Sequence, residues 1–160
     1  MKQDKFLIGI VVGIVLLVIV ALVVVMTRSP GSEAYIADNT PEGVVHNYFL
    51  AMQRKEYEKA YGYLSDDLVS KPTLDQFIRD VENSGSDSES SLKIGDVRPG
   101  DVHTQVDVTI TNYRTGNIFE NSSYSTEDTV FLKATNGGGV WKITLFPYPY
   151  WGWNWDQEQE

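Results

Sequence analysis

The chain begins with an apolar run that a small globular core does not need. Every residue from Phe6 to Met26 is apolar or glycine. This stretch of about 21 residues would reach roughly 31 Å as a helix, which matches the hydrocarbon thickness of a bilayer. The sequence therefore predicts a transmembrane anchor over residues 6–26, with membrane lipid as its partner. A cleavable signal peptide is the alternative, but its apolar region is normally only about 7 to 15 residues long.

The charges beside this run predict an orientation. Lys2 and Lys5 precede it, and Arg28 alone follows closely. Basic residues favour the cytoplasmic side, so residues 1–5 are expected in the cytoplasm and the rest of a single-pass cell-membrane protein outside it. Gly9 and Gly13 are spaced for close contact between two membrane helices, although glycine is also simply common in such helices.

Composition restricts the classes of function. The chain has 160 residues, room for one ordinary domain, with 13 Lys and Arg against 22 Asp and Glu and a net charge of −9. Nucleic acid is not expected as a partner, because its binding depends on basic side chains that neutralise phosphates. The absence of cysteine excludes disulfides and thiolate metal sites, and two histidines offer little for a metal. No metal or cofactor is expected.

Beyond the apolar run, residues 27–39 are predicted to be a linker, since they are rich in Ser, Pro, Gly, Asp and Asn. Helical spacing and capping residues then predict three helices. The first covers residues 41–54 after the N-cap Thr40, and the second covers residues 56–64. The third follows a capping box formed by Thr73 and Gln76.

From Leu92 onward the apolar residues recur at every second position, which is typical of a half-buried antiparallel sheet. Strands are predicted over residues 92–97, 102–112, 130–134 and 141–145. The segment from Tyr113 to Tyr124 is longer than a tight hairpin requires. The predicted fold class is α+β, with an N-terminal transmembrane helix followed by three helices packed on one face of a curved antiparallel sheet of about four strands.

Three stretches carry a family resemblance: Tyr57 to Leu68, the helix around Phe77-Ile78, and Val140-Trp141-Lys142-Ile143. Over residues 40–147 the chain resembles the nuclear transport factor 2-like superfamily, and more narrowly its membrane-anchored bacterial members of unassigned function. The resemblance implies a cone-shaped domain. It leaves the activity open, because that superfamily contains isomerases, dehydratases and many non-catalytic modules.

An enzyme of this fold needs an acid or base inside the cone. The face assigned to the core has no carboxylate, and Thr104 is a weakly polar exception among its apolar residues. Tyr48, Tyr61 and Tyr63 are the other candidates to line a cavity. The predicted function is therefore a non-catalytic binding or sensory module. Two alternatives remain: a scaffold subunit of an envelope secretion or conjugation assembly, and a small-molecule isomerase or dehydratase that uses the cone.

One further surface is a candidate for self-association. The residues alternating with the core positions of the second strand form a polar sheet face that would support a weak homodimer, or would simply meet water: His103, Gln105, Asp107, Thr109 and Thr111.

The C-terminal tail, residues 148–160, is aromatic and acidic. Pro147 and Pro149 prevent regular strand pairing, and an extended chain would place Trp151, Trp153 and Trp155 on one side. This strip predicts a site for a protein or glycan partner. Its candidate residues are Tyr148, Tyr150, Trp151, Trp153 and Trp155. The alternatives are that the tail folds back and completes the core, or rests at a lipid interface.

Overall fold

The structure, a computed structural model, describes residues 5–27, 33–85, 89–115, 121–135 and 139–157. Its contacts divide the chain into two compact units, Met1–Ala34 and Tyr35–Glu160, and each is described by itself.

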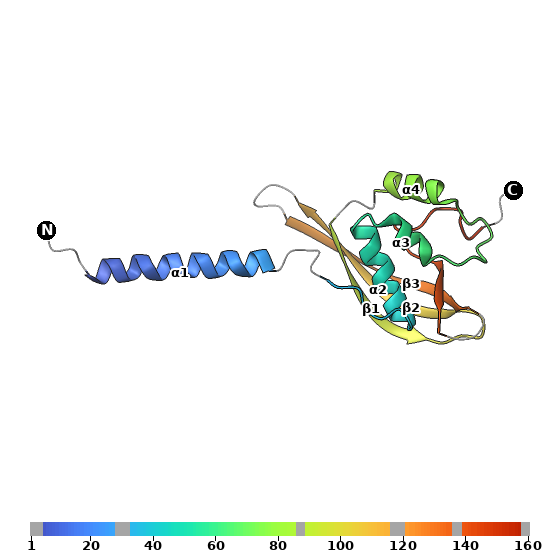
Figure 1. Ribbon diagram of the computed structural model, residues 1–160, viewed down its shortest axis with the longest axis horizontal. Coiled ribbons are helices and arrows are strands. Elements are labelled where there is room, and N and C mark those ends of the chain that lie inside the picture. Colours follow the sequence, from blue (N-terminus) through green and yellow to red (C-terminus); the bar gives the residue numbers. More distant parts are fainter. Residues whose placement is uncertain (1–4, 28–32, 86–88, 116–120, 136–138, 158–160) are drawn as a thin grey trace. The chain divides into compact units, whose positions relative to one another are not determined.

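The first unit contains helix α1, Lys5–Thr27 (Figure 1). Side chains are described for residues 9–23, and the large apolar ones among them are between 49% and 71% exposed. Within the described residues, none of the helices has both the length and the apolarity that crossing a membrane requires.

This finding corrects the prediction made for residues 6–26. They form a helix as expected, but the transmembrane anchor, the single-pass location and the outward placement of the domain that depended on it are not supported. Gly9 and Gly13 both lie in α1, and a Cβ at either position would meet no atom within 4 Å. A contact between helices at these glycines stays a prediction.

The second unit begins at Tyr35, earlier than the predicted start at residue 40. The buried side chain of Asn47 holds the backbone of Ile36 at two points: its Oδ1 accepts from the Ile36 N–H at 3.0 Å, and its Nδ2 donates to the Ile36 carbonyl at 2.8 Å. The carbonyl of Ala37 lies so close to Gly43 that a Cβ there would be 1.9 Å from the oxygen. Residues 35–39, predicted as linker, therefore belong to the domain.

The three predicted helices of the domain are confirmed. Helix α2, Pro41–Gln53, starts where the Thr40 hydroxyl accepts from the Gly43 N–H at 3.1 Å. Helix α3 covers Tyr57–Gly62, and helix α4 covers Leu74–Asn83. The capping box before α4 forms in full, because Thr73 and Gln76 each satisfy the other's backbone N–H.

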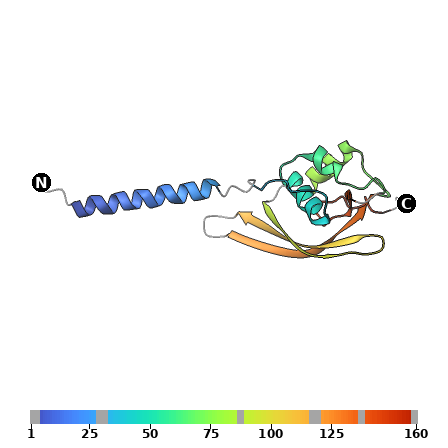
Figure 2. The same ribbon diagram turned by 60° about the horizontal axis from the view of Figure 1, so that its bottom comes forward.

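The four strands form one antiparallel sheet in the order β1-β2-β3-β4. Their bounds are β1 Ser90–Arg98, β2 Thr104–Thr115, β3 Asn121–Ala134 and β4 Trp141–Leu145. Figure 2 shows the sheet curving below the helices of the domain, with the C-terminal segment on the same side as the helices. The α+β class is confirmed apart from its transmembrane part.

Strands β2 and β3 differ from their predicted lengths. Their pairing runs without interruption from Thr104 opposite Leu132 to Thr115 opposite Asn121. Most of the segment predicted as a long connection is therefore strand, and its central residues 116–120 lie outside the described residues. Strand β2 begins at Thr104 rather than at residue 102, where Val102 is exposed.

The core lies between α2 and the concave side of the sheet, with α3, α4 and the C-terminal segment closing it. The chain that leaves α3 also pairs with the outer edge of β4. There the Ser65 N–H donates to the Ile143 carbonyl at 2.8 Å, and the Ile143 N–H donates to the Tyr63 carbonyl at 2.9 Å.

Candidate functional site

The C-terminal tail folds back into the core. Tyr150, Trp151 and Trp155 are 0%, 4% and 2% exposed. The extended strip of three indoles is not formed, because the chain turns after Tyr150 and places the rings of Trp151 and Trp155 edge to face, with centroids 5.1 Å apart. These three candidates therefore complete the core, as the alternative interpretation of the tail predicted.

Hydrogen bonds with four residues of the domain fix the tail. The buried Tyr48 hydroxyl of α2 donates to the Tyr150 carbonyl at 2.5 Å. The Trp155 indole N–H donates to Asp80 of α4 at 3.1 Å, and its carbonyl accepts from the Ser70 N–H at 3.2 Å. The Ser84 hydroxyl donates to the Pro149 carbonyl at 2.7 Å. The tail is therefore held at both ends of its aromatic segment.

Gly152 allows the tight turn between the two buried indoles. A Cβ at this position would lie 2.1 Å from the ring of Trp155. Trp155 is itself enclosed by the core and stacks against Phe77 with ring centroids 5.2 Å apart. The ring cannot move aside easily, so the close approach requires glycine.

Two aromatic side chains of the tail point outward. Tyr148 is 69% exposed and Trp153 is 85% exposed. Tyr148 is nevertheless fixed, because its hydroxyl donates to the Ser84 carbonyl at 2.9 Å. These two are the members of the predicted strip that remain available to a partner.

A groove of about 260 Å³ runs beside both exposed rings, and we call it the tail groove. It is lined by the tail together with the β3 residues Asp128 and Thr129 and the end of β4. The side chain of Trp151 also lines it, and the buried indole N–H of Trp151 has no hydrogen-bond partner among the described residues.

A second groove of about 230 Å³ lies on the sheet side of Tyr148, and we call it the sheet groove. Strand β2 contributes Ile110 and Asn112, and β3 contributes Tyr124, Thr126 and Asp128. Pro147, Tyr148 and Pro149 form its tail wall, and the end of α4 completes it. The two grooves share Asp128, Pro147 and Tyr148.

The position of Asp128 corrects an expectation about the core face. Asp128 pairs with Val108, and residues directly opposite each other in an antiparallel sheet share a face. Val108 is buried in the core, so the core face of β3 does carry a carboxylate where it reaches solvent. Thr126 and Tyr124 follow on the same face, opposite Ile110 and Asn112.

The charged residues that line the two grooves are all acidic. Asp128 borders both grooves, Asp156 borders the tail groove, and neither groove has a lysine or arginine among its described lining residues. Beside the sheet groove, burial raises the pKa of Tyr150, although the hydrogen bond it shares with Ser90 acts in the opposite direction. The site is thus aromatic, acidic and open to solvent.

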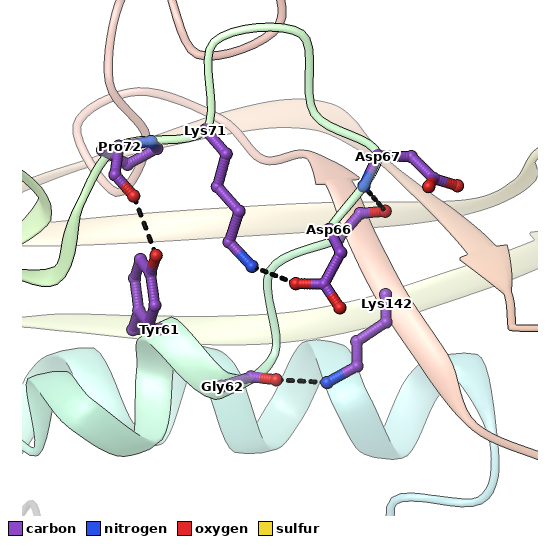
Figure 3. Close-up of polar contacts among 8 residues, drawn as sticks. Tyr61, Gly62, Asp66, Asp67, Lys71, Pro72 and Lys142 are labelled. Carbon is purple, nitrogen blue, oxygen red and sulfur yellow. Dashed lines mark hydrogen bonds and ion pairs between the residues drawn. The ribbon is translucent and has the colours of Figure 1, made fainter.

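The four predicted cavity residues do not line either groove. Tyr48 is fully buried, and burial raises the pKa of its hydroxyl far above the usual value. Tyr61 donates to the Pro72 carbonyl at 2.8 Å and so anchors the loop before α4 (Figure 3). Tyr63 lies beside the start of β4, where burial raises its pKa, and Thr104 is buried at the start of β2.

The same loop is held by exposed charges. Lys71 contacts Asp66 at 2.5 Å, and this hydrogen bond lowers the pKa of the Asp66 carboxyl (Figure 3). Lys142 of β4 donates to the Gly62 carbonyl at the end of α3. These contacts position the loop and lie apart from the lining residues of the two grooves.

On the outer sheet face proposed for dimerisation, several polar side chains contact one another within the same molecule. Asp107 contacts Arg98 and accepts from the Thr129 hydroxyl at 3.0 Å, and the hydroxyls of Thr111 and Ser125 are 2.8 Å apart. His103 meets the ring of Phe131 edge to face. A weak homodimer through this face stays a prediction. No group of three or more His, Asp or Glu side chains suited to a metal occurs among the described residues.

Comparisons with known proteins give a similarity in structure and no match in sequence. No protein-family model and no curated protein matches the chain. Among solved structures it is similar to a protein from Xanthomonas campestris described as a calcium/calmodulin dependent protein kinase II association domain. The identity is 14% and the TM-score 0.43, over 70% of this chain and 92% of that chain. The resemblance to the nuclear transport factor 2-like superfamily stays a prediction, and its membrane-anchored bacterial part is not confirmed.

Proposed function

We propose that the chain is a binding module whose site is the pair of grooves on either side of Tyr148. The observation that carries this proposal is the exposure of Tyr148 and Trp153 in a tail whose other large aromatic rings are buried. An exposed indole adds nothing to a core. Tryptophan and tyrosine are enriched where proteins bind partners, because each offers a large apolar surface together with a polar group.

The surroundings of the two rings favour binding as well. Tyr150 and Trp155 anchor the tail on either side of Trp153, so its backbone is already fixed before a partner arrives. A site that is ordered in advance loses less conformational entropy on binding. The aromatic tail thus has two roles, with buried rings that hold it and exposed rings that present a surface.

The other predicted functions rank lower. Asp128 favours an enzyme, because an isomerase or dehydratase of this fold needs an acid or base in the cone. Its side chain is exposed, however, whereas a catalytic acid or base usually lies in a site that excludes water. A scaffold role in a secretion or conjugation assembly stays a prediction on which no described contact bears.

A fragment screen tests the binding proposal. The full chain, labelled with ¹⁵N, would be titrated with a panel of primary amines, guanidines, carboxylates, sugars and neutral aromatic compounds while its nuclear magnetic resonance spectrum is recorded. We expect at least one class to shift the Trp153 indole N–H and the Tyr148 amide. Trp153→Ala should weaken that binding about tenfold and leave the melting temperature unchanged.

Tyr113→Ala is the matched control, because it removes another exposed aromatic ring, from β2, that lines neither groove. Binding should be unaffected by it. A panel in which no compound shifts either reporter at millimolar concentration, or in which both variants weaken binding equally, would contradict a site at these grooves.

A further inference from the structure

Resting on the proposed function, we infer that the grooves beside Tyr148 bind two basic side chains, arginine or lysine, from one extended segment of a partner protein. The inference concerns the chemical class of the occupant. It follows from the charge of the lining, from the aromatic rings at the rims and from the size and arrangement of the two grooves.

The charge of the lining selects a cation. Asp128 stands where the two grooves meet, and Asp156 adds a second carboxylate to the tail groove. The described lining residues include no basic side chain that would neutralise them. The chain as a whole carries a net charge of −9, so its field also attracts cations and repels phosphates and carboxylates.

The rims add aromatic faces, which attract cations through the ring quadrupole. Tyr148 borders both grooves, Trp153 borders the tail groove and Tyr124 borders the sheet groove. All three are exposed. A guanidinium or ammonium group that contacts such a ring can at the same time form an ion pair with a carboxylate of the groove. A neutral ligand cannot form that ion pair.

The domain already uses this chemistry within itself. Lys59 Nζ lies 2.9 Å from the centroid of the Tyr35 ring, and the guanidinium carbon of Arg54 lies 5.2 Å from it. The Tyr35 hydroxyl donates to Glu56 at 2.7 Å, so this cluster combines basic groups, an aromatic ring and a carboxylate. The two grooves likewise combine aromatic rings with carboxylates, but none of their described lining residues is a lysine or arginine. A basic side chain of a partner would complete the arrangement.

The size of the grooves points to side chains rather than to a whole small molecule. Their volumes are about 230 and 260 Å³. Sites for drug-sized ligands typically occupy about 300 to 1,000 Å³. Because the two grooves adjoin across Tyr148, one extended segment can place a basic side chain in each. Alternate residues of an extended chain point to the same side, which allows such a placement.

The test uses the full chain and a short peptide, Gly-Arg-Gly-Arg-Gly with blocked ends, titrated by calorimetry and by ¹⁵N spectra that report on Trp153. We expect binding that weakens as salt is raised, because charge attraction is screened. Asp128→Asn should weaken it about tenfold. Glu127→Gln is the matched control, since Glu127 is the neighbouring exposed residue of β3, on the opposite sheet face, and it should have no effect.

Two further probes identify the occupant. A peptide with glutamate in place of arginine should not bind, and arginine amide alone should bind at least tenfold more weakly than the peptide. Equal affinity for arginine amide would overturn the extended segment. Binding that survives Asp128→Asn, or that is equal for the glutamate peptide, would overturn the choice of a cation.

These results are separable from a failure of the proposed function. If sugars or neutral aromatic compounds shift Trp153 while the arginine peptide does not, the cation inference is wrong and the binding site stands. If no probe of any class shifts Trp153 or Tyr148, the proposed function fails, and the inference fails with it.

Discussion

Helix α1 and the aromatic segment of the C-terminal tail are both rich in large apolar side chains, but they differ in how far those side chains are exposed. Helix α1 shows its large apolar side chains on every side, and those that are described remain about half exposed or more. The C-terminal tail buries Tyr150, Trp151 and Trp155 and leaves Trp153 at the surface. Apolar composition alone therefore does not decide which side chains of a segment are buried.

The difference lies in how the apolar groups are distributed. In the tail, polar partners and tight turns let the backbone hydrogen-bond while selected rings turn inward, as the bonds to Ser70, Asp80 and Ser84 show. In α1 no polar face opposes the apolar residues, so the helix has no side that is better suited to a core than another. The core of the domain is made from residue 35 onward.

The largest effect on stability is expected from the buried rings of the C-terminal tail. Trp155→Ala should lower the free energy of unfolding by about 3 to 5 kcal/mol, because it removes a buried indole and its bond to Asp80. Chemical denaturation of the full chain measures the change. Trp153→Ala, two residues away and 85% exposed, should change stability by less than about 0.5 kcal/mol. Equal losses would show that the tail does not divide into buried and exposed rings.

A smaller loss is expected where the tail turns. Gly152→Ala should cost about 1 to 3 kcal/mol, because the new methyl group would overlap the enclosed ring of Trp155. Gly62→Ala is the control, since a Cβ there meets no atom within 4 Å and the residue ends α3. Thermal unfolding followed by circular dichroism distinguishes the two. An unchanged melting temperature for Gly152→Ala would mean that the tail is less closely packed than described.

Alkaline pH tests the bond that ties the tail to α2. Burial raises the folded-state pKa of Tyr48, so its stabilising contribution is complete below the unfolded pKa of about 10 and is lost as pH rises above that value. The free energy of unfolding should therefore fall above about pH 10. Tyr48→Phe should reduce the steepness of that fall, and should itself cost about 1 to 2 kcal/mol by leaving the Tyr150 carbonyl without its donor. Unfolding curves at pH 8 and pH 11 that shift equally in both proteins would contradict this account.

The smallest effect is expected at the other end. Removal of residues 1–34 should change the unfolding free energy of the domain by less than about 0.5 kcal/mol, because the core is made by residue 35 and those that follow it. Removal of residues 1–40 is the sharper partner experiment, since it also removes the backbone that Asn47 binds and the cap of α2. Only the longer deletion should destabilise the domain in denaturant titrations.

Local signals determined how much of this fold could be predicted. The capping box at Thr73 and Gln76 and the N-cap Thr40 located two helices, because capping depends on neighbouring residues only. Alternation located the C-terminal half of β3, where Val130 and Leu132 face the core. It failed before Val130, because β3 is polar and exposed on both faces there and its pairing with β2 is a tertiary effect.

The candidate site was predicted in part for the same reason. Tyr148 and Trp153 were among its expected residues, but Asp128 was missed because it lies in the polar half of β3. Counting back in steps of two from Leu132 and Val130 would have placed Asp128 on the core face. The turn that separates Trp153 from its neighbours depends on bonds to α4 and to the loop before it, and no pattern within the tail predicts those bonds.

The pairing of residues 63–65 with β4 bears on the resistance of the protein to aggregation. An edge strand of a sheet has unpaired backbone N–H and carbonyl groups with which a strand of another chain can form hydrogen bonds. At the middle of β4 the backbone N–H and carbonyl of Ile143 are already engaged by Tyr63 and Ser65. On the β1 side the pairing shifts register between Ile94 and Val97, which breaks the regular line of the strand. Fibril-like stacking of the sheets of successive molecules is thereby opposed at both sides, by coverage at one and by irregularity at the other.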